Sequence, residues 1–319
     1  MGSQLVDHDG DGRLDFFTAT YDGSPHIAYG VDGGFAEPQH LLDEDGARIR
    51  LEMYWDLDAS QWINVGGDNR HCISAVLFDW DGDGDHDLLM GDKNQGNLFL
   101  QRNEGTPGKD AFTGESEEVL AGGRSFALKG GMTAPRLVDW DGDGLMDIVA
   151  GSFGEPYQAN PPGGVYLYRN VGAADAPEFA AAVTLIAPTG IVGYEPDRPN
   201  VGLYADPVDY DGDGDLDLLV GGYAVVPARP RVLDAEEKDE LRELKARLPE
   251  VSRAMSAVLQ KAQEGEFESD EARREALRAA TQSEAYRTIS AKSTEIRKRI
   301  LELEPKPQRV PGIWVYLRD

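Results

Sequence analysis

Four stretches of the sequence carry aspartates at one fixed spacing. Each is a nine-residue pattern with aspartate at positions 1, 3, 5 and 9 and glycine at positions 4 and 6. The copies read DHDGDGRLD from Asp7, DWDGDGDHD from Asp79, DWDGDGLMD from Asp139 and DYDGDGDLD from Asp209. Near a protein surface, like charges about 4 Å apart repel by roughly 4 kcal/mol. We therefore expect a bound cation to offset the crowding of these carboxylates.

Calcium is the ion that this pattern favours. Ca²⁺ takes about 6 to 8 oxygen ligands, and four carboxylates with the backbone carbonyl at position 7 supply such a set. The glycines at positions 4 and 6 permit the positive φ angles that so tight a turn requires. Zinc is disfavoured, because the pattern contains neither cysteine nor a histidine at a constant position. An EF-hand needs glutamate at position 12, where this sequence has Thr18, Met90, Ala150 and Val220.

The strands that must position these loops recur with them. The loops begin 72, 60 and 70 residues apart, and each lies between two short apolar segments. Further apolar segments follow, such as GNLFLQRNEG from Gly96 and GGVYLYRNVG from Gly163. Four short strand-like segments per repeat, separated by turn residues, indicate a four-stranded antiparallel unit. Repetition of such units predicts an all-β chain with the fold of a β-propeller, built of four blades of which the last is incomplete.

The loops, the DLLMG, DIVAG and DLLVG strands and the LYRNVG segment resemble the FG-GAP or VCBS-type repeats of integrin α-subunit propellers and of many secreted bacterial proteins. FG-GAP-like proteins of planctomycete-type bacteria are similar as well. The resemblance spans most of residues 4–222 and the closing GIWVYLRD. It implies up to four Ca²⁺ ions, each between the first two strands of a blade. The ligands it implies are Asp7, Asp9, Asp11, Arg13 and Asp15; Asp79, Asp81, Asp83, Asp85 and Asp87; Asp139, Asp141, Asp143, Leu145 and Asp147; and Asp209, Asp211, Asp213, Asp215 and Asp217, with position 7 (Arg13, Asp85, Leu145, Asp215) contributing a backbone carbonyl.

A helical insertion interrupts the last repeat. Asp234 and Glu237 form a capping-box pattern, and leucines then recur at helical spacing. Pro249 is expected to kink or split this first helix. A second helical stretch is expected from about residue 270 to 304, with Ala280, Tyr286, Ile289, Ile296, Ile300 and Leu301 facing inward. We expect blades over residues 1–233, a helical hairpin over 234–305 and a returning strand of the fourth blade over 306–319. The hairpin could cover the blades, dock a partner or form a dimer.

Charge and composition narrow the classes of partner. The 319 residues include 58 acidic and 31 basic side chains, for a net charge of -27. This charge argues against nucleic acid and anionic membranes as partners and favours cations. No apolar run is long enough to predict a transmembrane helix, so no membrane insertion is expected. The single cysteine, Cys72, excludes an internal disulfide.

Recognition is expected at the end of the blades opposite the calcium loops. Calcium loops follow the first strand of each blade, so the long connections after the second strand and between blades open at the other end. The segment 43–71 has the side chains of a glycan or protein site, although its aromatics could simply pack the segment onto the blades. The candidate ligand-binding residues are Tyr54, Trp55, Asp56, Trp62, Asn69 and Arg70.

Three functional classes remain open. The first is a calcium-stabilised binding or adhesion module for an extracellular glycan or protein, the second a polysaccharide-active lyase or glycosidase, and the third a structural surface protein. No nucleophile elbow, P-loop or zinc-protease motif occurs, so we assign no catalytic residue and do not expect an enzyme. Extracellular calcium modules bind at roughly 10⁻⁴ to 10⁻³ M. We therefore expect a secreted or cell-surface protein and interpret the missing signal peptide as a truncation.

Overall fold

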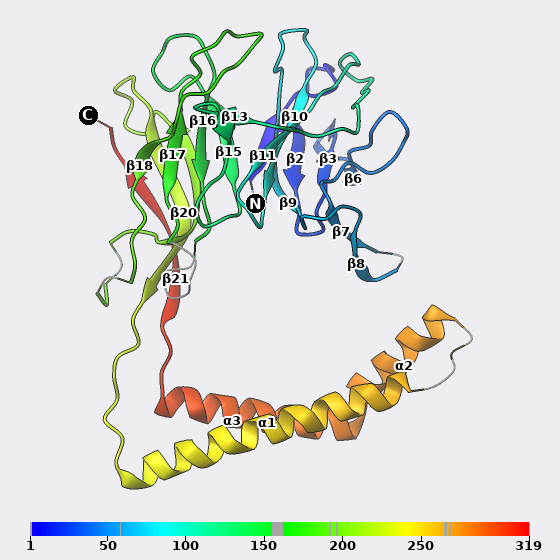
Figure 1. The fold of residues 1–319 in the computed structure, drawn as a ribbon, viewed down its shortest axis with the longest axis vertical. Coiled ribbons are helices and arrows are strands. Elements are labelled where there is room, and N and C mark those ends of the chain that lie inside the picture. Colours follow the sequence, from blue (N-terminus) through cyan, green and yellow to red (C-terminus); the bar gives the residue numbers. More distant parts are fainter. Residues whose placement is uncertain are drawn as a thin grey trace. The chain divides into compact units, whose positions relative to one another are not determined.

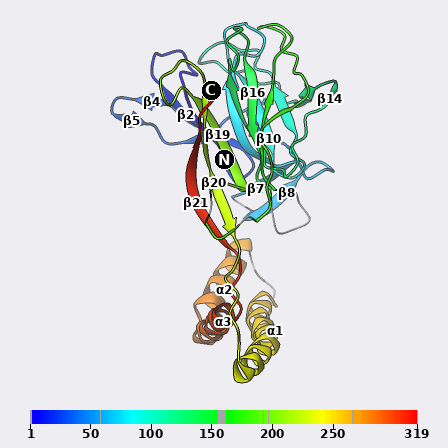
Figure 2. The ribbon, with the colours of Figure 1, turned by 90° about the vertical axis from the view of Figure 1, so that its left-hand side faces the viewer.

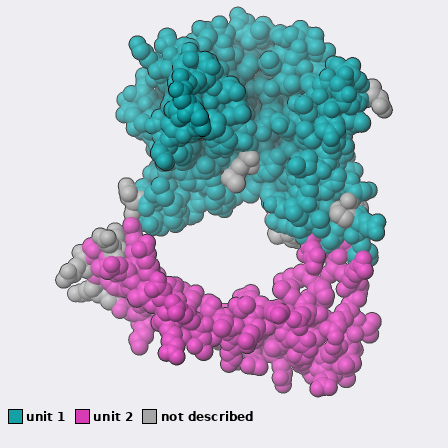
Figure 3. Space-filling model, turned by 180° about the vertical axis from the view of Figure 1, so that it is seen from behind, with its two compact units in different colours: residues 1–226, 309–319 teal, residues 227–308 magenta. Residues whose placement is uncertain are grey.

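A computed structural model describes residues 2–57, 59–154, 162–191, 193–195, 197–264, 267 and 269–318. The chain divides into two compact units, coloured teal and magenta in Figure 3. The first comprises residues 1–226 and 309–319, and the second comprises residues 227–308. The first unit is mostly β and contains all four aspartate loops, whereas the second contains three helices.

The first unit consists of successive small antiparallel sheets (Figure 1). The first sheet contains, in spatial order, β1 (Ser3–Val6), β2 (Asp15–Ala19), β3 (Pro25–Ala28) and β6 (Gln39–His40). The second contains β9 (Cys72–Phe78), β10 (Asp87–Asp92), β11 (Leu98–Gln101) and β12 (Glu117–Glu118). The third contains β15 (Ala134–Val138), β16 (Asp147–Gly151), β17 (Val165–Tyr168) and β18 (Val183–Ile186).

The fourth sheet has three strands within the described residues, namely β19 (Val201–Val208), β20 (Asp217–Val226) and β21 (Gln308–Tyr316). These strands lie side by side in Figure 2. The last strand returns only after the helical unit, which matches the interruption seen in the sequence. Three short hairpins complete this unit: β4 (Gly30–Val31) with β5 (Gly34–Phe35), β7 (Met53–Asp56) with β8 (Gln61–Asn64), and β13 (Leu120–Ala121) with β14 (Arg124–Ser125). No closed ring of sheets is detected in the described part of the chain.

The sheets pack face to face, and the apolar strand runs of the sequence explain why. Side chains alternate between the two faces of a strand. In β10, Leu88 and Met90 belong to the core shared with the first sheet, while Leu89 belongs to the core shared with the third. In β16, Ile148 faces back toward the second sheet and Val149 faces the fourth. A strand buried on both faces needs a continuous apolar run, which DLLMG and DIVAG provide.

The second unit contains α1 (Ala235–Gln263), α2 (Asp270–Gln282) and α3 (Glu284–Leu303). The capping box is confirmed: Asp234 accepts the N–H of Glu237, whose side chain accepts the N–H of Asp234 in return. Pro249 was expected to kink or split the first helix, and the split is wrong, because α1 continues through this residue. The second helical stretch instead breaks at Ser283, whose hydroxyl accepts the N–H of Tyr286 and so begins α3.

Helices α1 and α3 pack against each other through Val251, Ile296 and Ile300, and the predicted inward positions of Ile296 and Ile300 are confirmed. Leu301 was also expected to face inward, and this is wrong: it is 46 % exposed, while Leu303 is buried. Positions 296, 300 and 303 keep one face at helical spacing, and position 301 falls outside it. None of the described helices combines the length and the apolar character needed to cross a membrane.

Candidate metal sites and the opposite end of the sheets

Each aspartate loop joins the first strand of a sheet to the second: β1 to β2, β9 to β10, β15 to β16 and β19 to β20. Neighbouring loops lie at the same end of the sheets. His8 of the first loop contacts His86 of the second, with 3.4 Å between their Nδ1 atoms. Farther along, Arg318 at the end of β21 donates to the carbonyl of Trp140 in the third loop. The antiparallel pairing of first and second strands therefore gathers the acidic loops at one end.

Position 1 holds each loop closed. In the third loop, Asp139 Oδ1 accepts the N–H of Gly142 at 2.8 Å, and Oδ2 accepts that of Gly144 at 3.0 Å. These glycines have φ of 75° and 88°, and a Cβ at either would meet nothing within 4 Å. Glycine is therefore required for its backbone conformation and not for space. The predicted positive φ at positions 4 and 6 is confirmed in all four loops.

Position 9 has a structural role that the sequence analysis missed. Asp87 Oδ2 accepts the N–H of Trp80 at position 2 of its own loop, and Oδ1 accepts the N–H of Asn103 after the third strand. The same pair of hydrogen bonds recurs in the other three loops. Asp15 accepts the N–H groups of His8 and Gly30, Asp147 accepts those of Trp140 and Asn170, and Asp217 accepts those of Tyr210 and Arg318. Each of these buried carboxylates thus fastens an acidic loop to the rest of its sheet.

Carboxylate oxygens from three aspartates converge in every loop, each within 4.8 Å of the others. The first three loops use positions 1, 3 and 5, and the fourth uses positions 1, 3 and 9. The groups are Asp7, Asp9 and Asp11; Asp79, Asp81 and Asp83; Asp139, Asp141 and Asp143; and Asp209, Asp211 and Asp217. Hard oxygen ligands at this density suit Ca²⁺. These residues could therefore hold ions.

Several loop oxygens are buried without a hydrogen-bond donor. They are Asp7 Oδ1, Asp81 Oδ1, Asp215 Oδ1 and both oxygens of Asp85. Burial and the charges of Asp83, Asp87 and Asp81 raise the pKa of Asp85 to about 6. A buried anion without a partner is costly, and a cation is one way to satisfy it. The residues present therefore fit a bound divalent ion.

Arginines near the ends of the third strands partly offset the acidic charge. Arg102 lies 2.9 Å from Asp81, Arg169 lies 3.3 Å from Asp141, and Arg318 lies 3.8 Å from Asp215. These side chains are partly exposed, so each pair contributes about 0–1 kcal/mol. One arginine against four or five carboxylates leaves each of these loops strongly negative.

At the opposite end of the sheets, segment 43–71 contains the β7–β8 hairpin (Figure 1). Trp55 and Trp62 are cross-strand partners with ring centroids 5.6 Å apart. Trp62 also lies edge-on to His71 and Tyr21. Tyr21 is 51 % exposed and Trp62 is 38 % exposed. Lys93 lies 4.5 Å above the ring of Tyr21. Sequence reasoning named the two tryptophans but missed Tyr21 and Lys93, which come from other segments, and the packing role of His71 at the end of this segment.

The other candidate ligand-binding residues make local contacts. Tyr54 lies beneath the guanidinium groups of Arg48 and Arg50. Asp56 accepts the N–H of Ala59 in the hairpin turn. The side-chain oxygen of Asn69 accepts a hydrogen bond from the side-chain amide of Asn64. Arg70 pairs with Asp68 and lies over the ring of Phe99. The structure thus brings Trp55 and Trp62 together, while Asp56 and Asn69 hold turns and Arg70 packs against the second sheet.

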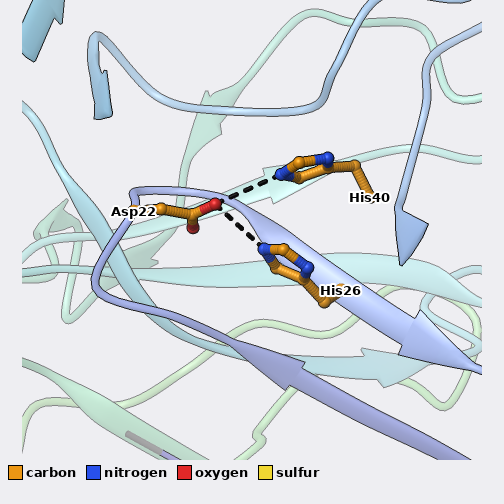
Figure 4. Close-up of side chains that lie close together, drawn as sticks. All are labelled: Asp22, His26 and His40. Carbon is orange, nitrogen blue, oxygen red and sulfur yellow. Dashed lines mark hydrogen bonds and ion pairs between the residues drawn. The ribbon is translucent and has the colours of Figure 1, made fainter. Parts of the chain in front are cut away.

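A second polar cluster lies beside this hairpin (Figure 4). Asp22 Oδ2 lies 3.0 Å from His26 Nε2, 3.2 Å from His40 Nε2 and 2.7 Å from Arg48 Nη2. Burial acts to raise the pKa of Asp22, but hydrogen bonds from the histidines and Thr20 outweigh it and hold that pKa well below its usual range. Burial lowers the pKa of His40, and the charge of Arg48 adds to this effect.

Comparison with known proteins bears on the repeats directly. The family model described as FG-GAP-like repeat matches residues 79–150 and 139–220. These ranges contain the second, third and fourth aspartate loops and the strands that lie between them in the sequence. No solved structure matches the chain. The resemblance found in the sequence is thereby confirmed for this part, and residues 79–220 consist of FG-GAP-like repeats.

Proposed function

We propose that this chain is a calcium-stabilised recognition module with propeller-like blades, working at the cell surface or after secretion. The observation that supports this most directly is the convergence of three carboxylates in each of four loops, with buried oxygens that lack donors. The extracellular setting follows from calcium chemistry, since modules of this type fill at roughly 10⁻⁴ to 10⁻³ M Ca²⁺. Successive sheets packed face to face support the blade arrangement.

In this proposal the ions act on stability and leave recognition to other residues. The aspartates at positions 1, 3 and 5, with the position-7 carbonyl and the position-9 carboxylate, hold the ion, which offsets their mutual repulsion. A ligand that binds only the folded state at 100 times its Kd stabilises it by about 2.7 kcal/mol per site. Because neighbouring loops touch through His8 and His86, ions at the first two loops stabilise the contact between the first two sheets.

Recognition in this proposal takes place at the other end, on a patch that we define as Tyr21, Trp62 and Lys93, with the buried His71 packed against both aromatic rings. Its aromatic faces and its ammonium group suit the apolar faces and hydroxyl groups of a sugar, or a protein loop with aromatic or acidic side chains. Loops on a rigid scaffold are the usual location of binding residues. The ligand class is therefore an extracellular glycan or protein.

Calorimetry tests the calcium part. Titration of the chelator-treated chain with Ca²⁺ is expected to show several sites, and Asp81→Asn with Asp83→Asn is expected to remove one of them. The matched control is Asp239→Asn, which removes an exposed carboxylate of α1 and should leave every site intact. A chain that takes up no Ca²⁺, and whose melting temperature is the same with and without chelator, would refute the calcium assignment.

Glycan-array and surface-display binding test the recognition part. Trp62→Ala is expected to reduce binding at least tenfold, whereas Phe35→Ala, an exposed aromatic of the β4–β5 hairpin, should leave it unchanged. Equal loss in both variants, or no ligand in either format, would argue for a purely structural role. Release of oligosaccharides from a polysaccharide would show that the chain is an enzyme and would contradict the proposal of a binding module.

A further inference from the structure

We propose that Asp22, His26 and His40 form a binding site for a transition-metal ion of the zinc type, separate from the aspartate loops. Figure 4 shows both imidazole rings directed at the carboxylate. The three ligand atoms lie within 4.8 Å of one another. This inference does not depend on the proposed calcium or recognition functions.

The sheet places the two histidines together. His26 in β3 and His40 in β6 are direct cross-strand partners, so their side chains project from the same face. Their ring centroids are 4.3 Å apart. Asp22 belongs to the turn between β2 and β3, which returns the chain alongside His26. Two strands and one turn thus aim three ligands at one point.

The spacing of the ligand atoms suits a small four-coordinate ion. With metal–nitrogen and metal–oxygen bonds of about 2.0 to 2.2 Å, neighbouring ligands of a tetrahedral ion lie about 3.3 Å apart. The corresponding distances here are 3.0 Å from Asp22 to His26 and 3.2 Å from Asp22 to His40. Three protein ligands leave the fourth position to water. Small shifts of the side chains would admit the ion.

Ligand chemistry separates this site from the aspartate loops. Two imidazoles favour zinc, copper or nickel over calcium, which prefers oxygen alone. The side chains are 17 to 27 % exposed, so an ion can reach them from solvent. The loops at the other end contain carboxylates and no constant histidine. The two sets should therefore fill independently with different metals.

Asp22 is already held in the orientation that a ligand needs. Its Oδ1 accepts the N–H of Ser24 at 3.1 Å, and Arg48 donates to its Oδ2 at 2.7 Å. Groups of this kind around a metal site fix the direction of the ligand. The positive charge of Arg48 also opposes a cation. We therefore expect weaker binding than at a closed structural zinc site with thiolate ligands.

An ion here would also affect the aromatic hairpin. The backbone N–H of Trp55 donates to the backbone carbonyl of Asp22 at 2.7 Å, and the Arg48 guanidinium donates to the backbone carbonyl of Trp55 at 3.0 Å. The turn that holds Asp22 is thus bonded to the strand that carries Trp55. Metal binding is expected to slow amide exchange in residues 53–64.

Calorimetric titration with Zn²⁺ tests the proposal, using the full chain in saturating Ca²⁺ so that the aspartate loops are occupied. One zinc site is expected. His26→Gln combined with His40→Gln should weaken zinc binding at least tenfold while calcium binding persists. The matched control is His86→Gln, which breaks the only other close histidine pair in the described residues and should retain zinc binding.

X-ray absorption of the zinc-loaded wild-type chain covers the case in which the double variant fails to fold. Two imidazoles and an oxygen around the ion support the site. The proposal is overturned if the wild-type chain binds no zinc, if the ion has fewer than two imidazole ligands, or if the folded double variant binds zinc as tightly as wild type. It is also overturned if His86→Gln alone abolishes binding.

Discussion

The two ends of the first sheet both gather metal-binding types of side chain, but they do so by different means. The loop from Asp7 to Asp15 takes its carboxylates from nine consecutive residues, and the N–H of Gly12 hydrogen-bonds to the carboxylate of Asp7. The cluster at the other end joins a turn and two strands, and Arg48 reaches Asp22 from 26 positions away. The first site is built into the local chain, whereas the second exists only when the sheet and hairpin have formed.

This difference implies different weaknesses. A loop that closes on its own backbone should keep its shape while the sheets around it loosen. A cluster assembled from distant segments should be lost as soon as one of them moves. Substitutions that remove hydrogen bonds made by a loop aspartate, or hydrogen bonds between distant segments, therefore test this difference between the two ends.

The largest effect is expected for Asp147→Ala in the third loop. This change leaves the N–H groups of Trp140 and Asn170 without their acceptor. Each orphaned donor costs about 1–3 kcal/mol, so we expect a loss of about 3–5 kcal/mol in the free energy of unfolding. Urea unfolding should show most of this loss in chelator as well as in Ca²⁺, because the hydrogen bonds do not require the ion.

Asp143→Asn is the control for that prediction. Asp143 is exposed and accepts an N–H from Leu145 within the same loop. We expect Asp143→Asn to weaken Ca²⁺ binding with little change in chelator. If Asp147→Ala were costly only in Ca²⁺, position 9 would act as a ligand alone and its fastening role would be wrong.

A somewhat smaller effect is expected for Arg48→Leu at the other end. Arg48 bonds to Ser24, to the carbonyl of Trp55 and to Asp22. Because the Arg48–Asp22 pair is partly exposed, we expect a loss of about 2–4 kcal/mol, somewhat below the cost of breaking a fully buried pair. Hydrogen exchange should speed up in residues 53–64 and stay unchanged in the loop 139–147. Arg50→Leu, which keeps the Asp22 pair, should have a smaller effect, and equally fast exchange at both ends would contradict the contrast.

The smallest effect is a stabilisation, expected for Asp85→Leu in chelator. Asp85 is 3 % exposed, and its pKa is raised from 3.8 to about 6 in the folded chain. The folded state therefore binds the proton more tightly than the unfolded state, and stability falls as pH rises from about 4 to about 6. A raise of about two pKa units corresponds to a cost of about 2–3 kcal/mol above pH 6.

Leucine already occupies this position of the third loop, as Leu145, so the variant should fold. Asp85→Leu is expected to remove the share of the pH dependence between 4 and 6 that Asp85 contributes, and to be more stable than the wild-type chain at pH 7 in chelator. In Ca²⁺ the gain should shrink, because the ion offsets the charge of Asp85. Thermal melts at pH 4.5 and 7 measure both effects, and an unchanged pH profile would show that Asp85 carries no such cost.

Much of the fold could be predicted because its signals repeat. Apolar runs such as DLLMG and DIVAG, repeated with the loops, predicted strands of four-stranded antiparallel units, and three four-stranded sheets were found. The predictions of helix ends were wrong where helical periodicity competes with a helix-breaking or helix-capping residue. Pro249 lies within α1 without ending it, whereas Ser283 splits the second helical stretch by capping α3. A serine inside a helical pattern is too common to mark a break from the sequence.

The sequence by itself determined the four aspartate loops. Their carboxylates, their glycines and most of their closing hydrogen bonds lie within nine residues, so residue type and spacing suffice to define them. Tertiary structure alone decided that Asp22 meets His26, His40 and Arg48, and that Tyr21 and Lys93 join Trp62. Those contacts depend on which strands pair and which sheets stack, and this follows from the packing of the whole core.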